Sequence, residues 1–313
     1  MSRGNKLIVI LGPTASGKTD LSIKLAKKFN GEIVSADSRQ VYKGMDIGTG
    51  KITKKEMQGV PHYLLDVANP KTRFTVSQFQ KLALKAINKI HKKNKIPFLV
   101  GGTGFYIQSV VDDIVIPEVK PDWKLRKKLE KLNTEQLFKK LKKLDPKRTE
   151  SIDKSNPRRL IRALEIVLKT GKAVPLTSDV AQIGLRRTSP ALRVLKIGIK
   201  KSNKELKKNI YKRLLKRLEN NVLINEVEKL HNPPAGGPGL SWKRLEEFGL
   251  EYRFVAQYLQ NKIAYKEMID KIQKESEHFT KRQMTWFKRD KKIYWIKNCK
   301  KAEKSIKNFI NKK

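Results

Sequence analysis

The first residues that could do chemistry form an eight-residue loop near the start of the chain. They are Gly12, Pro13, Thr14, Ala15, Ser16, Gly17, Lys18 and Thr19, which match the spacing G-x-x-x-x-G-K-[ST] between an apolar run and a helical pattern. Such a loop points backbone N–H groups into one concavity, where the helix dipole and the Lys18 ammonium attract phosphate. The Thr19 hydroxyl can bind Mg²⁺. The loop therefore predicts a site for a di- or triphosphate group, but it does not specify the reaction.

Two further polar segments follow later predicted strands. The first is SADSRQVY at 35–42, and the second is GGTGFY at 101–106. Open α/β sheets bind ligands at the carboxyl ends of their strands, so both segments are candidates for the same site. Three roles stay open for Asp37: a carboxylate that organises a metal, a general base, or a side-chain cap of its own turn. The GGTG segment alone is a weak signal.

The elements that must position these segments are short buried strands that alternate with helices. Apolar runs predict strands at 6–11, 32–35, 98–100 and 192–199, and a further one near 63–67. Apolar residues at helical spacing predict helices at 18–29 and 75–94. This alternation favours a parallel sheet with right-handed crossovers. We therefore expect an α/β fold, with a P-loop NTPase-like parallel sheet flanked by helices.

The chain changes character after Ile116, where Lys-rich amphipathic patterns begin. Helices are expected near 122–132, 134–144 and 157–170, bracketed by prolines. We interpret residues 119–190 as an all-helical insertion domain, and residues 1–118 with 191–313 as the core domain with its C-terminal helices. The C-terminal region is also expected to be helical, near 203–219, 222–231, 249–260 and 265–288, and the tail at 297–313 is expected to be either a weakly packed helix or frayed.

The charge of the chain indicates an acidic partner. Lys and Arg number 71 against 30 Asp and Glu, which gives a formal net charge of +41. The excess is +10 in residues 1–118, +15 in 119–200 and +16 in 201–313, so it grows away from the N-terminal segment. Nucleic acid is the leading candidate, because Lys and Arg that contact phosphates release counterions. The alternative is that most of these lysines belong to solvated helix faces.

Composition also excludes several classes of protein. Cys299 is the only cysteine, which excludes an intramolecular disulfide framework and a Cys-based zinc cluster. No apolar run approaches the ~18 to 20 residues of a membrane span. Periodic apolar runs along most of the chain argue against a wholly disordered polycation. We expect a folded, cytoplasmic protein that acts as a monomer and does not bind a membrane.

Several motifs occur together in a fixed order. They are GPTASGKT at 12–19, SADSRQVYKGMDIGTGK at 35–51, PHYLLDV at 61–67, GGTGFY at 101–106, NPRRLIRALE at 156–165 and KRQMTWFKRD at 281–290. In order and spacing they resemble the tRNA dimethylallyltransferase (tRNA isopentenyltransferase) family through nearly the whole chain. The resemblance implies transfer of a dimethylallyl group from dimethylallyl diphosphate to N6 of adenosine 37 in the anticodon loop of tRNA, which gives N6-dimethylallyladenosine and diphosphate. The implied partners are tRNA and dimethylallyl diphosphate, with Mg²⁺ as cofactor bound partly by Thr19.

The resemblance also implies roles for individual residues. Lys18 and the loop amides stabilise the leaving diphosphate, and Asp37 acts as a general base toward the weakly nucleophilic N6 amine. Thr103 contacts the adenosine or the reacting diphosphate. The target base has to flip out of the RNA loop to reach the pocket. The residues implied to bind tRNA are Asp37, Ser38, Arg39, Gln40, Thr103, Arg126, Arg158, Arg159, Arg162, Arg253, Lys281, Arg282, Gln283 and Trp286.

Alternatives stand beside this interpretation. Core packing is the other explanation for Trp286 and Phe287. The sequence departs from the family pattern at Ser276-Glu277-His278, where T-R-Q is common, and at Glu251, where glycine is usual. Two other functional classes are a small-molecule P-loop kinase and a non-catalytic RNA-binding module. A closer alternative is prenylation of free adenosine phosphates.

Overall fold

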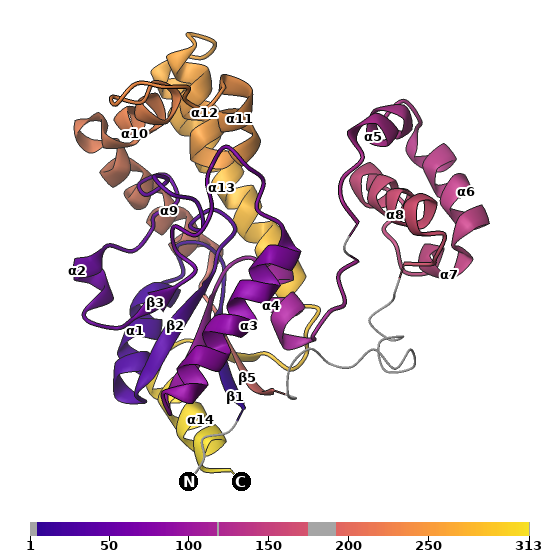
Figure 1. Cartoon of the computed structure of the whole chain (residues 1–313). Helices are drawn as coiled ribbons and strands as arrows, with labels where there is room; N and C mark the ends of the chain where they lie inside the picture. The colour runs from indigo at the N-terminus through magenta and orange to yellow at the C-terminus, as the bar shows by residue number, and fades with distance from the viewer. Residues whose placement is uncertain (1–4, 118, 175–191, 313) are drawn as a thin grey trace. The chain divides into compact units, whose positions relative to one another are not determined.

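A parallel sheet forms the centre of the chain in the computed structural model, which describes residues 5–117, 119–174 and 192–312. Within these residues the sheet has six strands in the order β3-β2-β4-β1-β5-β6, all parallel. The strands are β1 (Lys6–Leu11), β2 (Gly31–Ala36), β3 (His62–Tyr63), β4 (Ile96–Gly101), β5 (Arg193–Ile199) and β6 (Tyr294–Ile296). Helices flank the sheet (Figure 1), which confirms the predicted α/β class.

The helices predicted from apolar periodicity are all present, with ends within three residues of the expected ones. The helices are α1 (Lys18–Lys28), α2 (Lys54–Met57), α3 (Val76–Lys92), α4 (Gly104–Val111), α5 (Trp123–Leu129), α6 (Thr134–Leu144), α7 (Pro146–Thr149), α8 (Pro157–Thr170), α9 (Asn203–Leu218), α10 (Val222–His231), α11 (Trp242–Phe248), α12 (Leu250–Leu259), α13 (Tyr265–Phe287) and α14 (Cys299–Asn311). The short helices α2, α4, α7 and α11 and the strand β6 were not predicted, because so few residues carry little periodicity. No helix in the described ranges is long and apolar enough to cross a membrane.

The register of three neighbouring strands brings their loops together. Leu11 of β1 lies opposite Gly101 of β4, and Ala36 of β2 lies opposite the same glycine. A Cβ on Gly101 would overlap the backbone of Ala36, so glycine is needed for this close approach. Because the strands are parallel and end level with one another, the segments after β1, β2 and β4 all leave the sheet at one edge.

The two faces of β1 pack against different helices. Leu7 and Val9 belong to a core shared with α3, α4 and the end of α13. Ile8 and Ile10 face a second core shared with α1 and α14. All four side chains are fully buried. A parallel sheet covered on both faces accounts for the continuous apolar run in this part of the sequence.

The tail predicted at 297–313 forms a helix, α14, as one of the two alternatives expected, but the expectation that it is weakly packed or frayed is wrong. Helix α14 buries Ala302 and Ile306 completely against the sheet. The Lys6 ammonium donates hydrogen bonds to the Ile310 carbonyl at 2.5 Å and to the Lys312 carbonyl at 3.2 Å. The apolar stripe of α14 therefore anchors the helix, and the start of β1 caps its last turn.

A third core lies at the loop-bearing end of the sheet, where α9, α10, α11 and α12 gather (Figure 1). These helices and the first part of α13 pack around Val41, Tyr42 and Met45, which follow β2. All three of these side chains are buried. The segment that leaves β2 is therefore embedded among helices that come more than 150 residues later in the chain.

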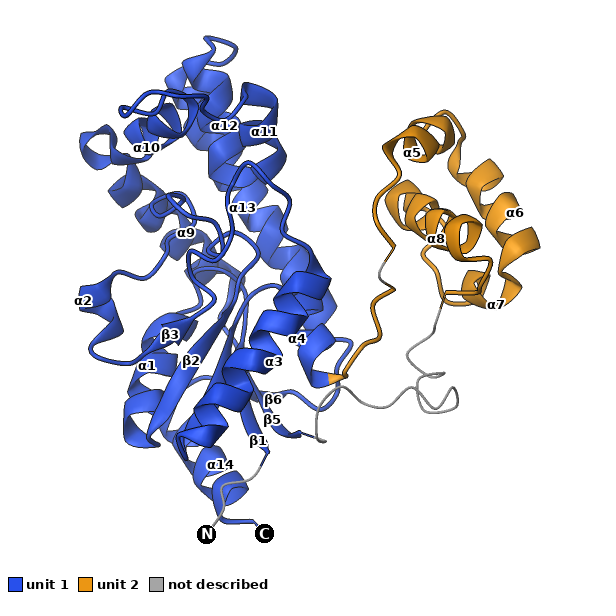
Figure 2. Ribbon diagram, viewed as in Figure 1, with its two compact units in different colours: residues 1–111, 189–313 blue, residues 112–188 orange. Residues whose placement is uncertain are grey.

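The chain divides into two compact units, unit 1 (Met1–Val111 with Ser189–Lys313) and unit 2 (Asp112–Thr188), shown in Figure 2. The insertion predicted at 119–190 corresponds to unit 2, which begins earlier, at Asp112. Residues 175–190 of the predicted insertion lie outside the described residues. In the described part of unit 2, helices α5, α6, α7 and α8 enclose a separate core of leucine, isoleucine and alanine side chains.

A buried carboxylate joins the helices of unit 2. Glu165 on α8 is fully buried. It accepts hydrogen bonds from Arg126 Nε and Nη2 at 2.8 and 2.7 Å, from the Asp122 N–H at 2.6 Å and from Arg162. Burial alone would raise the pKa of Glu165, but the hydrogen bonds from Arg126, Asp122 and Arg162 outweigh it and lower the pKa to about 2. The ionised carboxylate thus links α5 to α8.

Glu165→Gln should destabilise unit 2 by about 3 kcal/mol, since Arg126 and Arg162 lose their charged partner. The folded-state pKa lies below the ordinary 4.5, so the contribution is complete above pH 4.5 and is lost as the pH falls toward 2. Hydrogen exchange of α8 amides, corrected for intrinsic rates, should show less protection in E165Q at pH 7 and a smaller difference at pH 3. Glu135→Gln, which breaks an exposed pair with Lys139, is the control, and an equal loss there would refute the prediction.

Candidate active site at the carboxyl edge of the sheet

The loops after β1, β2 and β4 surround one pocket. Thr103, after β4, binds the end of β2 and the loop that follows it: its N–H donates to the Ala36 carbonyl at 3.2 Å, and its Oγ1 accepts a hydrogen bond from the Ser38 N–H at 3.1 Å. The pocket has a volume of about 40 Å³, and its lining includes Lys18, Thr19, Asp37, Gln40, Gly50 and Gly101. The three segments that the sequence marked as candidates therefore meet.

The loop from Gly12 to Thr19 turns sharply between β1 and α1. Ala15 and Gly17 have positive φ angles of 59° and 83°. Among the described residues, no side chain caps the first turn of α1, and the buried Ser16 Oγ has no hydrogen-bond partner. Uncapped N–H groups at a helix start and an unsatisfied buried hydroxyl suit a bound anion.

Lys18 places a cation at the same pocket. Its ammonium donates a hydrogen bond to the Pro13 carbonyl at 3.1 Å. Burial lowers the pKa of Lys18 to about 8; Asp37 opposes this shift, and Arg213 adds to it. Because burial and a second cation disfavour the charged form, a phosphate group at this pocket would stabilise the ammonium.

Asp37 uses one of its oxygens to shape its own turn. Its Oδ1 accepts hydrogen bonds from the Arg39 N–H at 2.8 Å and the Gln40 N–H at 3.3 Å. The side-chain cap that the sequence left open is therefore present. No hydrogen bond to Oδ2 occurs within the described residues, and Asp37 lines the pocket. The turn orients the carboxylate and leaves one oxygen for chemistry.

Residues of α9 that the sequence did not predict reach the same site. Asn209 Nδ2 donates a hydrogen bond to the Ala15 carbonyl at 3.1 Å. A Cβ on Gly50 would overlap the guanidinium groups of Arg213 and Arg217. Because Gly50 lines the pocket, both arginines stand directly beside it. Helix α9 thus contacts the loop after β1 and the segment after β2.

The Arg213 side chain is exposed, and its guanidinium lies close to Gly50. Neighbouring protein atoms, with a smaller contribution from Arg217, lower the pKa of Arg213 to about 10. The guanidinium still carries its charge at neutral pH. A signal for it exists in the sequence: polar residues at 209, 213 and 217 run beside the buried stripe at 206, 210, 214 and 218.

Comparison with known proteins gives the family. A family model described as IPP transferase matches residues 40–290. The chain is 40% identical over 311 residues to a tRNA dimethylallyltransferase of Acetivibrio thermocellus, which covers 97% of this chain and 96% of the relative. It is 39% identical over 295 residues to a tRNA dimethylallyltransferase of Halalkalibacterium halodurans, covering 93% and 90%. The chain belongs to the IPP transferase family.

Solved structures agree with this assignment. A full-length tRNA isopentenylpyrophosphate transferase from Bacillus halodurans matches with a TM-score of 0.68 and 36% identity, over 98% of this chain and 95% of that one. A eukaryotic dimethylallyltransferase acting on tRNA matches with a TM-score of 0.76 and 25% identity, over 97% and 77%. The sheet with its flanking helices is therefore an arrangement that this chain shares with solved transferases.

Gln283 is placed differently from the expectation for an IPP transferase. Its side chain is only 7% exposed. Its Oε1 accepts a hydrogen bond from the Thr14 N–H at 2.9 Å, and its Nε2 donates to the Gly102 carbonyl at 2.8 Å. Both ends of the amide therefore join the loops after β1 and β4, which replaces the expected tRNA contact with a structural one.

The four arginines of unit 2 that were expected to bind tRNA divide into two groups. Arg126 and Arg162, which were expected to face tRNA, bind the buried Glu165 and hold α5 to α8. Arg158 and Arg159 are exposed at the start of α8, and Arg159 has a distant partner in Asp153 at 4.0 Å. Only the second group presents guanidinium groups mainly to solvent.

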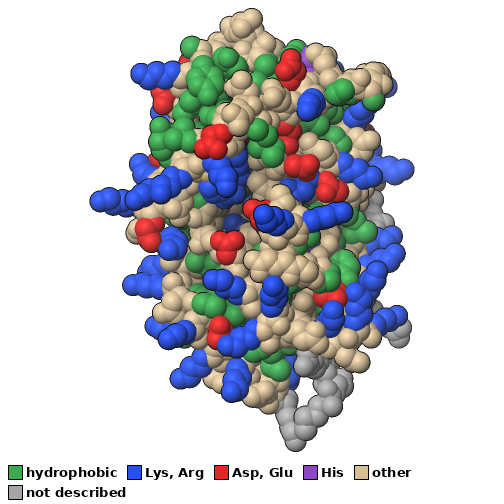
Figure 3. Space-filling view, turned by 90° about the vertical axis from the view of Figure 1, so that its left-hand side faces the viewer, with side chains coloured by type: hydrophobic (Ala, Val, Ile, Leu, Met, Phe, Trp, Pro, Cys, Tyr) green, Lys and Arg blue, Asp and Glu red, His purple; other side chains and the backbone are tan. Residues whose placement is uncertain are grey.

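The expected contacts in the C-terminal helices are mostly exposed. Arg253 on α12 and Lys281 and Arg282 on α13 all lie at the surface. Arg282 pairs with Glu275 at 2.7 Å. Lys and Arg side chains spread over the whole face drawn in Figure 3, with acidic groups between them. Charge density alone therefore does not locate an RNA site on that face.

The two aromatic residues at the end of α13 lie in different environments, one in the core and one at its edge. Phe287 is 3% exposed and belongs to the sheet core, as the core-packing alternative expected. Trp286 is half-buried, with its ring 6.2 Å from the Phe105 ring and the Arg289 guanidinium 5.8 Å from its ring centre. Phe105 is 42% exposed. Trp286 therefore lies where the core meets an exposed ring.

The departures from the family pattern form ion pairs with α9. Glu251 pairs with Arg217 at 2.7 Å, and Glu277 pairs with Lys207 at 2.9 Å. The carboxylates thus hold α12 and α13 to the helix that reaches the pocket. In this IPP transferase both residues thus act as partners of cations on α9.

Lys18 predicts a pH dependence of anion binding. With a pKa of about 8 in the free protein, the ammonium loses its charge as the pH rises from 7 to 9. The affinity for inorganic diphosphate should therefore fall across this range relative to Lys18→Arg, whose guanidinium stays charged. Calorimetric titrations of both proteins in the same buffers cancel the ionisation of diphosphate itself. Parallel profiles for the two proteins would refute the prediction.

Proposed function

We propose that this chain transfers a dimethylallyl group from dimethylallyl diphosphate to N6 of adenosine 37 in the anticodon loop of tRNA, with diphosphate as the second product. Curated relatives of nearly the same length are named tRNA dimethylallyltransferases. The observation that carries the proposal is that Lys18, Thr19 and Asp37 line one pocket. A diphosphate cradle and a carboxylate at one site suit alkyl transfer from a diphosphate ester to an amine.

Most of the groups at the site are assigned to the leaving diphosphate. The bond between the allylic carbon and the diphosphate oxygen breaks as the carbon bonds to N6, and the electron pair leaves with the diphosphate. The amides at the start of α1, Lys18 and Arg213 stabilise this negative charge. The phosphate-binding role of the Gly12–Thr19 loop rests on its open N–H groups and on the unpartnered Ser16 hydroxyl.

Mg²⁺ fits the oxygen donors of this pocket. In the described residues no three His, Cys, Asp or Glu side chains group as a metal site. Mg²⁺ commonly binds through substrate phosphates, water and only one or two protein oxygens. We therefore assign the Thr19 hydroxyl as its protein ligand. When bound, the ion supplies further charge neutralisation for the diphosphate.

Asp37 is assigned as the general base. The exocyclic N6 amine gains positive charge as its new C–N bond forms, and a carboxylate oxygen can take its proton. Oδ1 is engaged by two backbone N–H groups, so Oδ2 is the oxygen for this step. Thr103, which holds the Ser38 N–H, keeps the turn of Asp37 in place.

The RNA has to deliver one unstacked base to the pocket. A single-stranded loop base flips at the lowest cost in free energy. We assign Ser38, Arg39 and Gln40 to the flipped adenosine, because they surround Asp37. The exposed Arg158, Arg159, Arg253, Lys281 and Arg282, with Trp286, are assigned to the tRNA backbone and loop. We infer that the protein acts on tRNA in the cytoplasm as a monomer.

Mass analysis of tRNA nucleosides tests the reaction. Protein, Mg²⁺, dimethylallyl diphosphate and unmodified tRNA should yield N6-dimethylallyladenosine. Asp37→Asn keeps an acceptor for the Arg39 and Gln40 N–H groups but cannot take a proton, so the rate should fall about 10² to 10⁴-fold with the fold unchanged. Thr103→Ala should also lose transfer. Full activity of D37N would refute the base role, and phosphate transfer from labelled ATP to a nucleoside would favour the kinase class.

Exposed arginines should contribute to tRNA affinity through charge. Arg158→Ala and Arg282→Ala should each weaken tRNA binding and should reduce the slope of log affinity against log salt concentration by about 1. Lys307→Ala on α14 removes the same charge from an exposed position at the opposite end of the sheet from α9 to α12 (Figure 1). Filter binding at several salt concentrations measures all three, and an equal change in K307A would contradict the assignment.

A further inference from the structure

One wall of the pocket has no helix or strand of its own. Part of this wall belongs to a loop of residues 46–50, here called the 46–50 loop. Gly50 lines the pocket. The Gln40 side chain, which also lines it, donates a hydrogen bond through Nε2 to the Gly50 carbonyl at 3.2 Å, and the Gln40 N–H bonds Asp37 at 3.3 Å. The placement of Asp37 and Gln40 therefore depends on what holds this loop.

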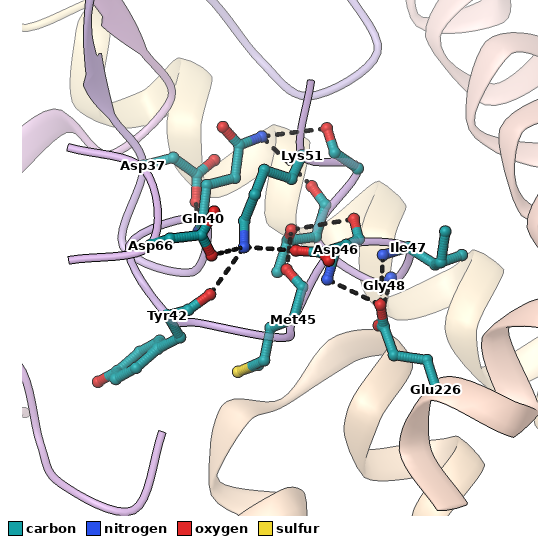
Figure 4. Close-up of polar contacts among 12 residues, drawn as sticks. Asp37, Gln40, Tyr42, Met45, Asp46, Ile47, Gly48, Lys51, Asp66 and Glu226 are labelled. Atoms are coloured by element: carbon teal, nitrogen blue, oxygen red, sulfur yellow. Dashed lines mark hydrogen bonds and ion pairs between the residues drawn. The ribbon is translucent and has the colours of Figure 1, made fainter. Parts of the chain in front are cut away.

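A single carboxylate from α10 holds it. Glu226 Oε2 accepts hydrogen bonds from the N–H groups of Asp46 at 2.7 Å and Ile47 at 2.6 Å, and Oε1 accepts one from the Gly48 N–H at 3.0 Å (Figure 4). Three consecutive N–H groups thus converge on one side chain. A backbone arranged in this way favours a negative charge.

Tyr252 completes the set of donors. Its hydroxyl donates to Glu226 Oε1 at 2.7 Å. Burial raises the pKa of Tyr252 well above its ordinary value, and the Glu226 carboxylate raises it further, so the hydroxyl keeps its proton. With four donors converging, Glu226 has to be an acceptor at both oxygens, and only the ionised carboxylate meets this requirement.

The other side of the loop faces the cations of α9. The Gly48 carbonyl accepts a hydrogen bond from Arg217 Nη1 at 3.1 Å. A Cβ on Gly48 would overlap the Tyr252 ring, and one on Gly50 would overlap Arg213 and Arg217. The loop is therefore confined between Tyr252 on one side and the two guanidinium groups on the other. A shift of the loop would displace the pocket wall and Arg213 together.

Lys51 fixes the end of the loop. Its ammonium donates to the Tyr42 carbonyl at 2.8 Å and pairs with Asp46 and Asp66, each at 2.5 Å (Figure 4). The Lys51 side chain is only 5% exposed. Lys51 holds the loop to neighbouring parts of the chain, Arg217 holds Gly48 to α9, and Glu226 holds the N–H groups of residues 46–48 to α10. Glu226 is therefore the connection from the C-terminal helices that engages three consecutive N–H groups of the loop.

We propose that Glu226 is a positioning residue of the transfer reaction: its carboxylate fixes the 46–50 loop so that Gly50 and Arg213 keep their places at the site for the diphosphate of the donor. Glu226 acts through the loop and does not touch the reacting atoms. The inference rests on the proposed function for its meaning in catalysis, although the effect on diphosphate binding does not require catalysis.

Glu226→Gln tests this in the full-length protein. The amide replaces one acceptor by a donor that opposes the backbone N–H groups, so the Kd for inorganic diphosphate and the KM for dimethylallyl diphosphate should rise about tenfold. The tRNA Kd and the melting temperature should stay near the wild-type values. Glu228→Gln is the matched control, because Glu228 lies on the same helix at an exposed position, and its constants should not change.

Tyr252→Phe distinguishes the bonds that Glu226 makes to the loop from the bond that it makes to α12. It removes the bond between α12 and Glu226 but keeps the three bonds to the loop, so its diphosphate Kd should stay close to the wild-type value. A loss of diphosphate affinity in Y252F as large as in E226Q would overturn the proposal. So would unchanged diphosphate affinity in E226Q, as in E228Q. An E226Q protein that binds diphosphate and tRNA equally weakly and has a lower melting temperature would also overturn it. Absence of prenyl transfer by the wild type would refute the proposed function, while the diphosphate Kd values would still test Glu226.

Discussion

The site depends on hydrogen bonds between the backbones of short loops and side chains from helices far along the chain. Strand register brings the loops after β1, β2 and β4 to one edge, but it does not fix their shape. Gln283 joins the first loop to the third, Asn209 holds the first loop to α9, and Glu226 holds the segment after β2 to α10. The helices that follow the sheet are thus part of the pocket, because without them each loop would have unpaired backbone groups.

Charge is the second constraint, because the cations at the pocket repel one another and favour the binding of an anion. Lys18 and Arg213 approach the same pocket, and each has a lowered pKa, first because of burial and also because of another cation. Asp37 opposes both shifts, and Glu251 and Asp20 also oppose that of Arg213. A diphosphate would relieve the repulsion between these cations, and its departure as a product would restore it. The arrangement therefore favours a leaving group that gains charge as its bond breaks.

The sequence predicted the elements and the pocket loops more fully than the helices' contribution to the site. Periodicity is a local property, so strands such as β1 and helices such as α8 could be predicted with accurate ends. Strand ends and motif spacing likewise predicted that Lys18, Asp37 and Thr103 belong to one site. Glu226 and Arg213 were not predicted, because their role arises only when α9 and α10 pack beside the loops. Gln283 and Arg162 were assigned to RNA because a polar side chain in a motif gives no sign of the partners it binds within the fold.

The order of the strands has a consequence for how the protein is made. β1 is the first strand synthesised, yet it is central and pairs with β4 and with β5, which follows all of unit 2. One face of β1 is covered by α14, whose last turn is capped by Lys6. The sheet therefore cannot be completed until the ribosome has released nearly the whole chain, and its long-range pairings favour slow folding. Unit 2, which has a core of its own, can form before β5 is synthesised, while β1 still lacks this neighbour.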